Sequence, residues 1–371
     1  MRALPDVRRV LDVFSGSARV AHALKAAGFY VLANDHNAYA RVLAGCYVGA
    51  NRERVERAAR LVLAELNRLP GRPGYVTAKY CEEARFFQPK NGARIDVIRD
   101  AIEEMSLEPD LRAVVLTSLL EAADRVDSTC GLQMAYLKGW SPRSHNELEL
   151  RLPDCLPGPG EAHQLDALEA AASFEVDVAY LDPPYNQHSY LRNYHIWETL
   201  VLWDAPSVYG VARKRADCRE RLSAFNSRRA AARALEALVD RMQARFLVVS
   251  FNDEGYLDRE QIAAILRRRG PVAALEFDYR RYVGARIGIY NPAGVRVGRV
   301  GRLRNRERLF LVGDGVLDVS LGGELTLLTD GAAEPSEELD PGHGPAAERG
   351  EVGGHELGVE EGVAGPVQGL D

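Results

Sequence analysis

Four short polar segments of this chain combine residue types that could do chemistry together. They are FSGSARV from Phe14, NDHN from Asn34, DPPYN from Asp182 and FNDEG from Phe251. Each segment comes at the end of a run of apolar residues that favour β-structure. Because ligands of open α/β sheets bind beyond the carboxyl ends of the strands, we expect the four segments to converge on one cleft.

The segment Asp182-Pro183-Pro184-Tyr185-Asn186 carries the most specific chemical signal. Two prolines after a buried strand restrict the backbone and remove two N–H donors, which leaves carbonyl oxygens free as acceptors. Such a site suits an amine. The exocyclic amino group of adenine becomes a better nucleophile when the Asp182 carboxylate and the Pro183 carbonyl accept its hydrogens, and Tyr185 supplies a face on which a flipped-out base would stack. The alternative interpretation is a proline turn that only ends the strand.

The glycine-containing turn DVFSGSARV, which starts at Asp12, predicts a site for a ligand that has a ribose but no phosphates. A pyrophosphate cofactor needs G-x-G-x-x-G, and of these glycines only Gly16 is present. Asp35 lies 19 residues after Gly16, at the end of the next strand, where its carboxylate would accept hydrogen bonds from ribose hydroxyls. S-adenosylmethionine fits this description, whereas the missing glycines disfavour a dehydrogenase with a nicotinamide cofactor. The same residues also fit a turn before a helix that binds no ligand.

The elements that must position these segments alternate between strands and helices. Apolar runs predict strands at residues 10–14, 29–33, 176–181 and 246–251, and helical periodicity predicts helices at residues 18–27, 192–203, 229–244 and 258–269. Between the second and third strands, helical periodicity appears at residues 55–66, 95–105 and 111–123. Strand-like runs follow at residues 274–279, 285–290, 296–300 and 308–312. The predicted fold is a doubly wound, Rossmann-like α/β sheet with a helical insertion.

The chain divides into four predicted regions. Residues 1–45 and 161–330 form the two parts of the core, residues 46–160 the helical insertion, and residues 331–371 a disordered acidic tail. The tail holds ten acidic residues against one basic residue, a charge of −9 that leaves +3 on the first 330 residues. It also has ten Gly, four Pro and no aromatic residue, so it buries too little apolar surface to offset its ordering entropy.

Composition excludes several classes of protein. The 371 residues are 46% hydrophobic and 27% charged, which is typical of a globular chain rather than a collagenous or wholly disordered one. The longest apolar runs stop well short of the ~20 residues of a membrane span. No secretory signal is apparent, and five scattered cysteines predict neither a disulfide framework nor a metal site. We therefore expect a cytoplasmic protein with no membrane partner and no metal.

The order of these motifs resembles a known family. FSGSARV with ND, then LDPPYN, then SFNDEG, with a long insertion after the first pair, is similar to DNA adenine methyltransferases whose target-recognition domain lies between the cofactor and catalytic motifs. The resemblance covers about residues 10–312. It implies transfer of a methyl group from S-adenosylmethionine to the exocyclic amino group of adenine in double-stranded DNA. It also implies a restriction-modification system with a restriction endonuclease acting on the same sequence.

Two alternative functions stay open at this point. One is a methyltransferase of the same fold that acts on a base amino group in ribosomal RNA. The insertion of over 100 residues favours DNA over this alternative, because a protein that reads a duplex sequence needs such a domain. The other is a non-catalytic DNA-binding regulator, which the intact Asp182 and Tyr185 disfavour.

The resemblance also assigns residues to roles. The implied cofactor-binding residues are Asp12, Phe14, Gly16, Asp35, Asp166 and Asp182. The implied catalytic residues are Asp182, Pro183, Pro184 and Tyr185. Candidate substrate-binding residues are Asn186, Tyr190, Asn193 and Tyr282, and eight basic residues within residues 213–233 are candidates for phosphate contact.

Two features depart from the pattern of this family. Ala18 stands where the family has the second glycine of its cofactor loop. Family members also carry a cofactor-binding segment before the first strand, whereas only about nine residues precede that strand here. We therefore expect either that another part of the chain supplies those cofactor contacts or that the given sequence starts after that segment.

Overall fold

The structure is a computed structural model that describes residue 4, residues 6–280 and four shorter stretches. Those stretches are residues 289–290, 296–298, 304–316 and 325–327. Tyr282 and the predicted acidic tail lie outside the described residues. No helix among the described residues is both long enough and apolar enough to cross a membrane.

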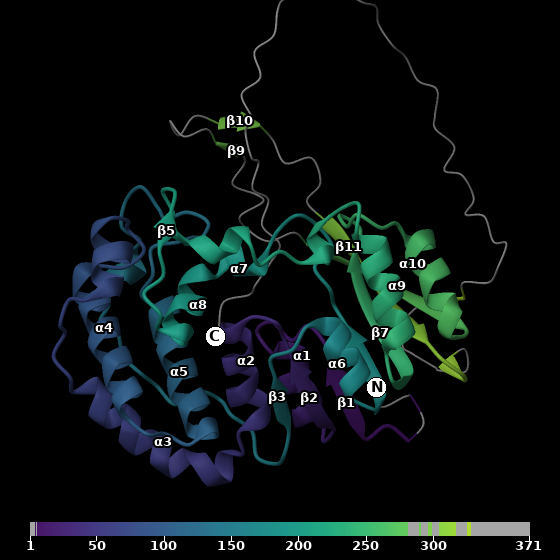
Figure 1. The fold of residues 1–371 in the computed structure, drawn as a ribbon, viewed down its shortest axis with the longest axis horizontal. Coiled ribbons are helices and arrows are strands. Elements are labelled where there is room, and N and C mark those ends of the chain that lie inside the picture. The colour runs from purple at the N-terminus through teal and green to yellow at the C-terminus, as the bar shows by residue number, and fades with distance from the viewer. Residues whose placement is uncertain are drawn as a thin grey trace, which may run out of the picture.

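Within the described residues, eight strands form one mixed sheet in the order β12-β8-β11-β7-β4-β1-β2-β3 (Figure 1). The strands from β3 to β7 in this order pair in parallel, and β11, β8 and β12 continue the sheet in antiparallel pairing. Their bounds are β1 Arg9–Asp12, β2 Tyr30–Asn34, β3 Glu161–His163, β4 Val176–Leu181, β7 Ala244–Asn252, β8 Val272–Arg280, β11 Arg304–Val312 and β12 Leu325–Leu327. This topology confirms the predicted α/β class, and edge strand β3 is an addition to the predicted elements.

Both faces of the sheet are buried. On one face, Leu11, Leu181 and Val249 pack against helices α6 (Ala167–Ser173), α9 (Ala231–Arg241) and α10 (Arg259–Leu266). On the other face, Val10 and Val178 belong to a separate cluster, against which Leu24 of α1 (Arg19–Ala26) packs. Successive side chains of a strand point to opposite faces. Strands such as β4 therefore read as continuous apolar runs in the sequence, because neither face meets water.

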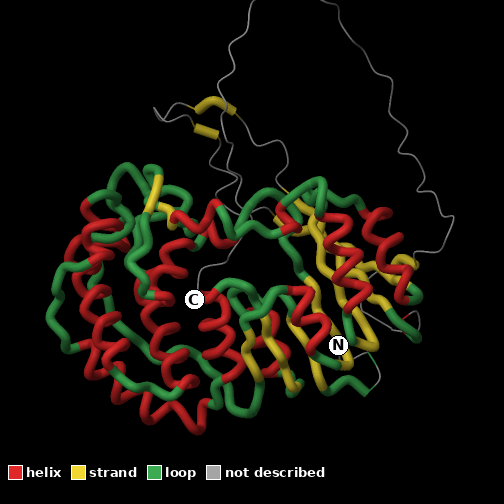
Figure 2. Tube along the Cα trace, in the orientation of Figure 1, coloured by secondary structure: helices red, strands yellow, loops and turns green. Residues whose placement is uncertain are grey.

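Between β2 and β3 the chain forms the helical insertion, and Figure 2 shows its helices gathered on one side of the molecule, whereas the other side holds strands together with helices. Its elements are α2 Ala38–Ala44, a π-helix Gly45–Gly49, α3 Arg52–Asn67, a second π-helix Thr77–Glu82, α4 Pro89–Glu104, α5 Pro109–Asp124 and a 3₁₀-helix Pro142–His145. Its core includes Tyr80, Phe86 and Leu119. Helix α8 (His195–Leu202), which follows β4 in the chain, places Ile196 and Leu200 in the same core. The insertion and the second half of the sheet domain therefore share one hydrophobic core.

Two predicted helices differ from the observed ones. The helix predicted over residues 192–203 is two helices, α7 (Tyr190–Asn193) and α8, because Tyr194 between them leaves helical geometry at φ −129° and ψ 33°. The helix predicted over residues 229–244 ends at Arg241, because the chain already enters β7 at Ala244. A capping box begins α10: Asp258 accepts from the Gln261 N–H at 2.8 Å, and the Gln261 side chain accepts from the Asp258 N–H at 3.0 Å.

Two short ribbons lie outside the large sheet. One pairs β5 (Val208–Tyr209) with β6 (Lys214–Arg215), and the other pairs β9 (Ile289–Tyr290) with β10 (Arg296–Gly298). Between β5 and α9 the chain makes two 3₁₀ turns, Ala216–Arg219 and Ala224–Asn226. These turns bring the chain from the insertion back to the sheet.

Asp96 of α4 fixes the loop that enters the second π-helix. Its carboxylate accepts the backbone N–H groups of Gly74, Val76 and Thr77 at 2.8 to 2.9 Å, and the Thr77 hydroxyl at 2.7 Å. Asp96 is 2% exposed, so water does not replace these bonds if the carboxylate is lost. Unsatisfied buried donors are costly, and we expect this one side chain to contribute strongly to the stability of the insertion.

We predict that Asp96→Ala lowers the free energy of unfolding by about 3 kcal/mol, because it leaves several buried hydrogen-bond donors without an acceptor. Urea denaturation followed by circular dichroism measures this loss. Glu104→Ala, an exposed change on the same helix, is the control and should stay within about 0.5 kcal/mol of the parent chain. Equal unfolding midpoints for the two variants would contradict the assigned role of Asp96.

Candidate active site

A cavity of about 1220 Å³ opens beyond the carboxyl ends of β1, β2 and β4. The predicted site residues that line it are Asp12, Phe14, Gly16, Asp35, Asp166, Asp182, Pro184 and Tyr190. The predicted residues that do not line it are Pro183, Tyr185, Asn186 and Asn193. Tyr282 lies outside the described residues. Residues as far apart in the chain as Asp12 and Tyr190 thus meet in one space.

The turn after β1 is tied to the end of β2. Gly16 has φ +51°, a left-handed conformation that glycine adopts without steric cost. Its N–H donates to Asp35 Oδ2 at 3.0 Å, and the Asn37 N–H donates to Asp35 Oδ1 at 2.9 Å. Of these hydrogen bonds, Asp35 Oδ2 accepts only the one from Gly16, and a carboxylate oxygen can accept a second. The Asp35 carboxylate therefore both shapes the loop and keeps an acceptor for a ligand.

Ala18 occupies a position that favours glycine. It has φ +60° and ψ 17° just before α1, and its N–H donates to the Ser15 carbonyl at 2.6 Å. A residue with a Cβ pays about 1 kcal/mol or more for left-handed geometry. The replacement of the second motif glycine by Ala18 thus leaves the loop conformation in place at a cost in strain.

Acidic side chains converge at the strand ends, and burial shifts their pKa values. Desolvation raises the pKa of Asp12 well above its usual range, and the neighbouring Asp182 and Asp35 carboxylates raise it further. Burial also raises the pKa of Asp35, against the opposing effect of its N–H donors. For Asp182, desolvation and then the charge of Glu307 raise the pKa to about 7. This concentration of carboxylates favours a cationic ligand.

The polar atoms at this end of the cavity suit a ligand with hydrogen-bond donors. Within the described residues, Asp12 Oδ1, Ser15 Oγ and Asn37 Oδ1 are buried and have no hydrogen-bond partner. Buried polar atoms usually have partners, so a cluster of orphaned oxygens indicates a missing donor. A methyl group placed on Gly16 would meet nothing within 4 Å, so space is also left beside the turn. Ribose hydroxyls and an ammonium group, as in S-adenosylmethionine, match this acceptor set.

The DPPYN segment leaves β4 at the rim of the cavity. Asp182 and Pro184 line the cavity, whereas Pro183 is buried behind them. Tyr185 packs against the cluster on one sheet face, and its carbonyl accepts the Tyr256 N–H at 2.9 Å. The side-chain amide oxygen of Asn186 accepts the His188 N–H at 3.0 Å. In this structure Tyr185 and Asn186 therefore hold the loop rather than form the cavity wall.

Glu307 is a site residue that sequence reasoning missed. It lies on β11 opposite Asn252 of β7, accepts from Ser250 Oγ at 2.8 Å and lines the cavity beside Asp182. The sequence signal was a single acidic residue among arginines, directly before the strand-like run 308–312. Only the antiparallel pairing of β11 with β7 brings it to the end of β4, because that pairing joins residues 57 apart in the chain.

Aromatic side chains that the sequence did not single out form much of the remaining wall. Tyr39 of α2 lies 5.7 Å from the ring of Tyr194, and Trp197 of α8 also lines the cavity. The predicted Tyr190 is 43% exposed at the mouth, so its ring is accessible for stacking. Phe225 packs edge-on against Phe14 at 5.3 Å. Three of these aromatic residues lie in or next to α7 and α8, which shows that the break at Tyr194 opens toward the cavity.

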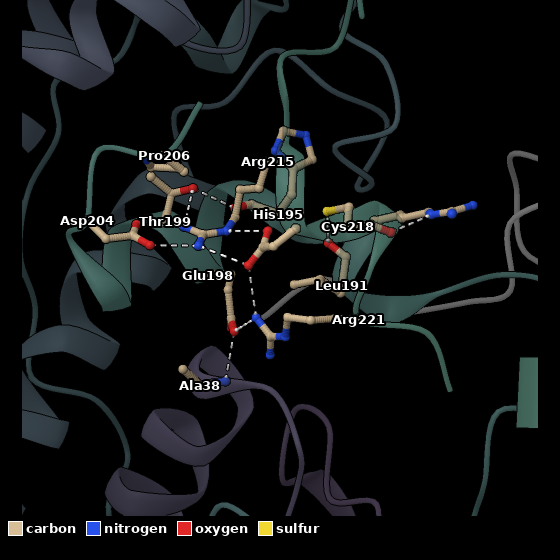
Figure 3. A network of polar contacts seen from close by, with 12 residues as sticks. Ala38, Leu191, His195, Glu198, Thr199, Asp204, Pro206, Arg215, Cys218 and Arg221 are labelled. Atoms are coloured by element: carbon tan, nitrogen blue, oxygen red, sulfur yellow. Dashed lines mark hydrogen bonds and ion pairs between the residues drawn. The ribbon is translucent and has the colours of Figure 1, made fainter. Parts of the chain in front are cut away.

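The basic residues 213–233 only partly fit the predicted phosphate contacts. Arg215 is 3% exposed and pairs with Asp204 and Asp217, and Arg221 pairs with the fully buried Glu198 (Figure 3). The phosphate-contact prediction is therefore wrong for Arg215, because its guanidinium is buried and paired with carboxylates of the protein. Arg228 and Arg229 are exposed and keep the predicted assignment.

Comparison with known proteins agrees with this site. Residues 1–265 match the family of D12 class N6 adenine-specific DNA methyltransferases. Type II methyltransferase M.NlaIII of Neisseria lactamica is 31% identical over 282 residues, which cover 73% of this chain and 83% of that relative. Type II methyltransferase M.CviAII of Paramecium bursaria Chlorella virus 1 is 23% identical over 281 residues, with the same coverage of the two chains.

Similarity to a larger relative is more local. Type II methyltransferase M.FokI of Planomicrobium okeanokoites is 31% identical over 209 residues, which cover 54% of this chain but only 32% of that protein. The family match, by contrast, includes the turn at Gly16, the insertion and the DPPYN segment. The chain therefore belongs to the D12 class of N6 adenine-specific DNA methyltransferases, a family that uses S-adenosylmethionine as methyl donor.

Proposed function

We propose that this enzyme methylates adenine at a specific sequence in double-stranded DNA, as the modification enzyme of a restriction-modification system. The observation that carries the proposal is the single cavity that joins the Asp35 end of β2 to the Asp182 end of β4. A methyl transferase must hold donor and acceptor in one space, because in-line transfer depends on the relative placement of the two. The names of its relatives, among them modification methylase StsI of Streptococcus sanguinis, support the proposed biological role.

In this proposal the residues at Gly16 hold the cofactor. Asp35 binds the ribose hydroxyls, Phe14 contacts the adenosine, and the orphaned oxygens of Asp12 and Ser15 take up donors of the amino-acid portion. When bound, S-adenosylmethionine supplies a methyl group on a positively charged sulfur. The buried carboxylates favour that charge, because neutralising them relieves their mutual repulsion.

Asp182 acts on the target base in this proposal. Its carboxylate accepts a hydrogen of the N6 amino group, which raises the electron density on a nitrogen whose lone pair is otherwise delocalised into the ring. Asp182 then takes the proton that N6 must lose. A pKa of about 7 suits this step, because proton transfer is most effective when the pKa of the accepting group lies near the working pH. Tyr190 stacks on the base in this proposal, which its exposure and its place in the cavity wall support.

We predict that Asp182→Asn reduces kcat for methyl transfer to plasmid DNA by about 10²-fold or more, because the amide is a poorer acceptor and takes no proton. The affinity for S-adenosylmethionine, measured by calorimetry, should change less than tenfold. Tritium transfer from labelled cofactor into DNA measures kcat. Glu175→Gln, at the exposed far end of β4, is the matched control and should keep the parent rate. Normal turnover in Asp182→Asn would remove Asp182 from the mechanism.

A pH prediction follows from the same carboxylate. Asp182 accepts hydrogen only when it is ionised, so kcat/KM should rise with pH and level off above its midpoint at about 7. Glu307→Gln removes the neighbouring negative charge, lowers the pKa of Asp182 and should move the midpoint to lower pH. The profile is measured on plasmid DNA at constant ionic strength, with Glu175→Gln again as control. An unmoved midpoint would show that Glu307 does not act on Asp182.

Sequence specificity is tested in a bacterium that lacks adenine methylation. Expression of the chain should produce N6-methyladenine within one short sequence motif across the chromosome, and single-molecule sequencing reads that motif directly. Methylation scattered without a common motif would contradict site specificity. Purified enzyme should act on duplex oligonucleotides that contain the motif and not on versions with one altered base pair, since a mismatch in a recognised site costs about 1 to 3 kcal/mol.

A further inference from the structure

Residues 221–226, which we call the closing segment, form a continuous part of the cavity wall. Every residue from Arg221 to Asn226 lines the cavity. The segment lies between β6 and α9, far from the cofactor turn in the sequence, and it contains the 3₁₀ turn Ala224–Asn226 capped by Ser223. In the sequence analysis only Arg221 of this segment has an assigned role, as one of the basic residues of 213–233, and the cavity-lining residues 222–226 have none.

The closing segment contacts the cofactor turn through an aromatic pair. The ring of Phe225 packs edge-on against Phe14 at 5.3 Å with an interplanar angle of 82°. Phe225 is 7% exposed and also belongs to the hydrophobic cluster of the sheet. This contact places apolar surface against the turn that precedes α1.

Glu198 links the closing segment to the other side of the cofactor site. Its carboxylate is fully buried and accepts Arg221 Nη1 at 2.7 Å. The same carboxylate accepts the backbone N–H groups of Ala38 and Tyr39 at 3.2 and 3.0 Å, at the start of α2. Figure 3 shows Glu198 between Arg221 and Ala38. Since α2 begins three residues after Asp35, this bridge fixes the segment relative to the ribose-binding carboxylate.

Asn226 links the closing segment to the catalytic loop. Its side-chain amide donates to the carbonyl of Asn186 at 2.7 Å and to the carbonyl of His188 at 3.0 Å. These carbonyls belong to the loop directly after Tyr185. One side chain therefore uses both of its N–H donors to hold two points of that loop. The Asn226 carbonyl in turn accepts the Tyr256 hydroxyl at 3.4 Å.

From these three sets of contacts we propose that the closing segment covers the cofactor site and that Asn226 is a positioning residue that transmits cofactor binding to the catalytic loop. The inference deepens the proposed function and rests on it. Phe225 supplies the cover, Glu198 with Arg221 sets its position, and Asn226 ties the loop that receives the target base to the same unit. A bound cofactor then orders residues 186–189 through the segment.

Two variants separate the two roles. Phe225→Ala should weaken binding of S-adenosylmethionine about tenfold or more, because it removes the apolar cover, and Phe225→Leu serves if the alanine variant does not fold. Asn226→Asp keeps the size of the side chain but removes its two donors. It should leave cofactor affinity within about threefold of the parent chain and lower kcat by about 10²-fold, as expected when a catalytic loop is misplaced. Calorimetry gives the affinities, and tritium transfer to plasmid DNA gives kcat.

Hydrogen exchange measures the coupling between cofactor binding and the order of residues 186–189 without requiring methyl transfer. Adding S-adenosylhomocysteine to the parent chain should slow exchange of the backbone amides in residues 186–189. The same addition to Asn226→Asp should protect the turn around Gly16 but not residues 186–189. Ser227→Ala, which changes the neighbouring exposed side chain, is the matched control and should behave as the parent chain does in all three measurements.

The outcomes distinguish this inference from the function on which it rests. Equal protection of residues 186–189 in Asn226→Asp and in the parent chain would overturn the positioning role, and so would an unchanged kcat. Loss of cofactor affinity in Asn226→Asp as large as in Phe225→Ala would also overturn it, because the two roles would then not be separate. If the parent chain itself transfers no methyl group to adenine, the proposed function fails, while the exchange measurements still decide what Asn226 does.

Discussion

The crowding of carboxylates at the ends of parallel strands is the constraint on which this site depends. Parallel strands end at the same edge of a sheet, so Asp12, Asp35 and Asp182 share one cavity although they lie far apart in the chain. Burial raises the pKa values of all three; the neighbouring Asp182 and Asp35 carboxylates raise that of Asp12 further, and Glu307 raises that of Asp182. The fold thus concentrates buried carboxylates in the cavity, and such a setting favours a cationic ligand.

The surrounding elements serve to keep this cavity closed and aligned. The insertion and α8 form a shared core, so the wall that carries Tyr39 is fixed to the chain that follows the DPPYN segment. Buried Glu198 satisfies the start of α2 and pairs with Arg221 at the same time. Some of the basic residues that the sequence analysis assigned to DNA contact instead form ion pairs within the protein, as Arg215 and Arg221 do. This placement explains why the basic residues of 213–233 include the buried Arg215.

Much of the fold was predictable from the sequence, and each feature that the sequence analysis missed was missed for an identifiable reason. The strands of the parallel core were readable because burial on both faces makes each a continuous apolar run, as in β4. Edge strand β3 was not readable, because three partly exposed residues carry no such run. The break at Tyr194 was missed because α7 and α8 share one apolar pattern, and only packing against the insertion separates them. Ala18 shows that a motif position tolerates a residue whose conformation is strained.

The sequence by itself determined the chemistry at the strand ends: the turn at Gly16, the carboxylate of Asp35 and the acceptor-rich rim at Asp182 are local patterns that need no partner to be recognised. It also determined the family, because those patterns occur in a fixed order. Only the tertiary structure decided which distant side chains complete the site. Glu307 reaches it through antiparallel pairing, and Phe225 and Asn226 reach it through a loop, and such contacts leave no periodicity in the sequence. The physical reason is that strand pairing and loop packing are long-range and depend on the whole fold, whereas turns and strand ends are specified by neighbouring residues.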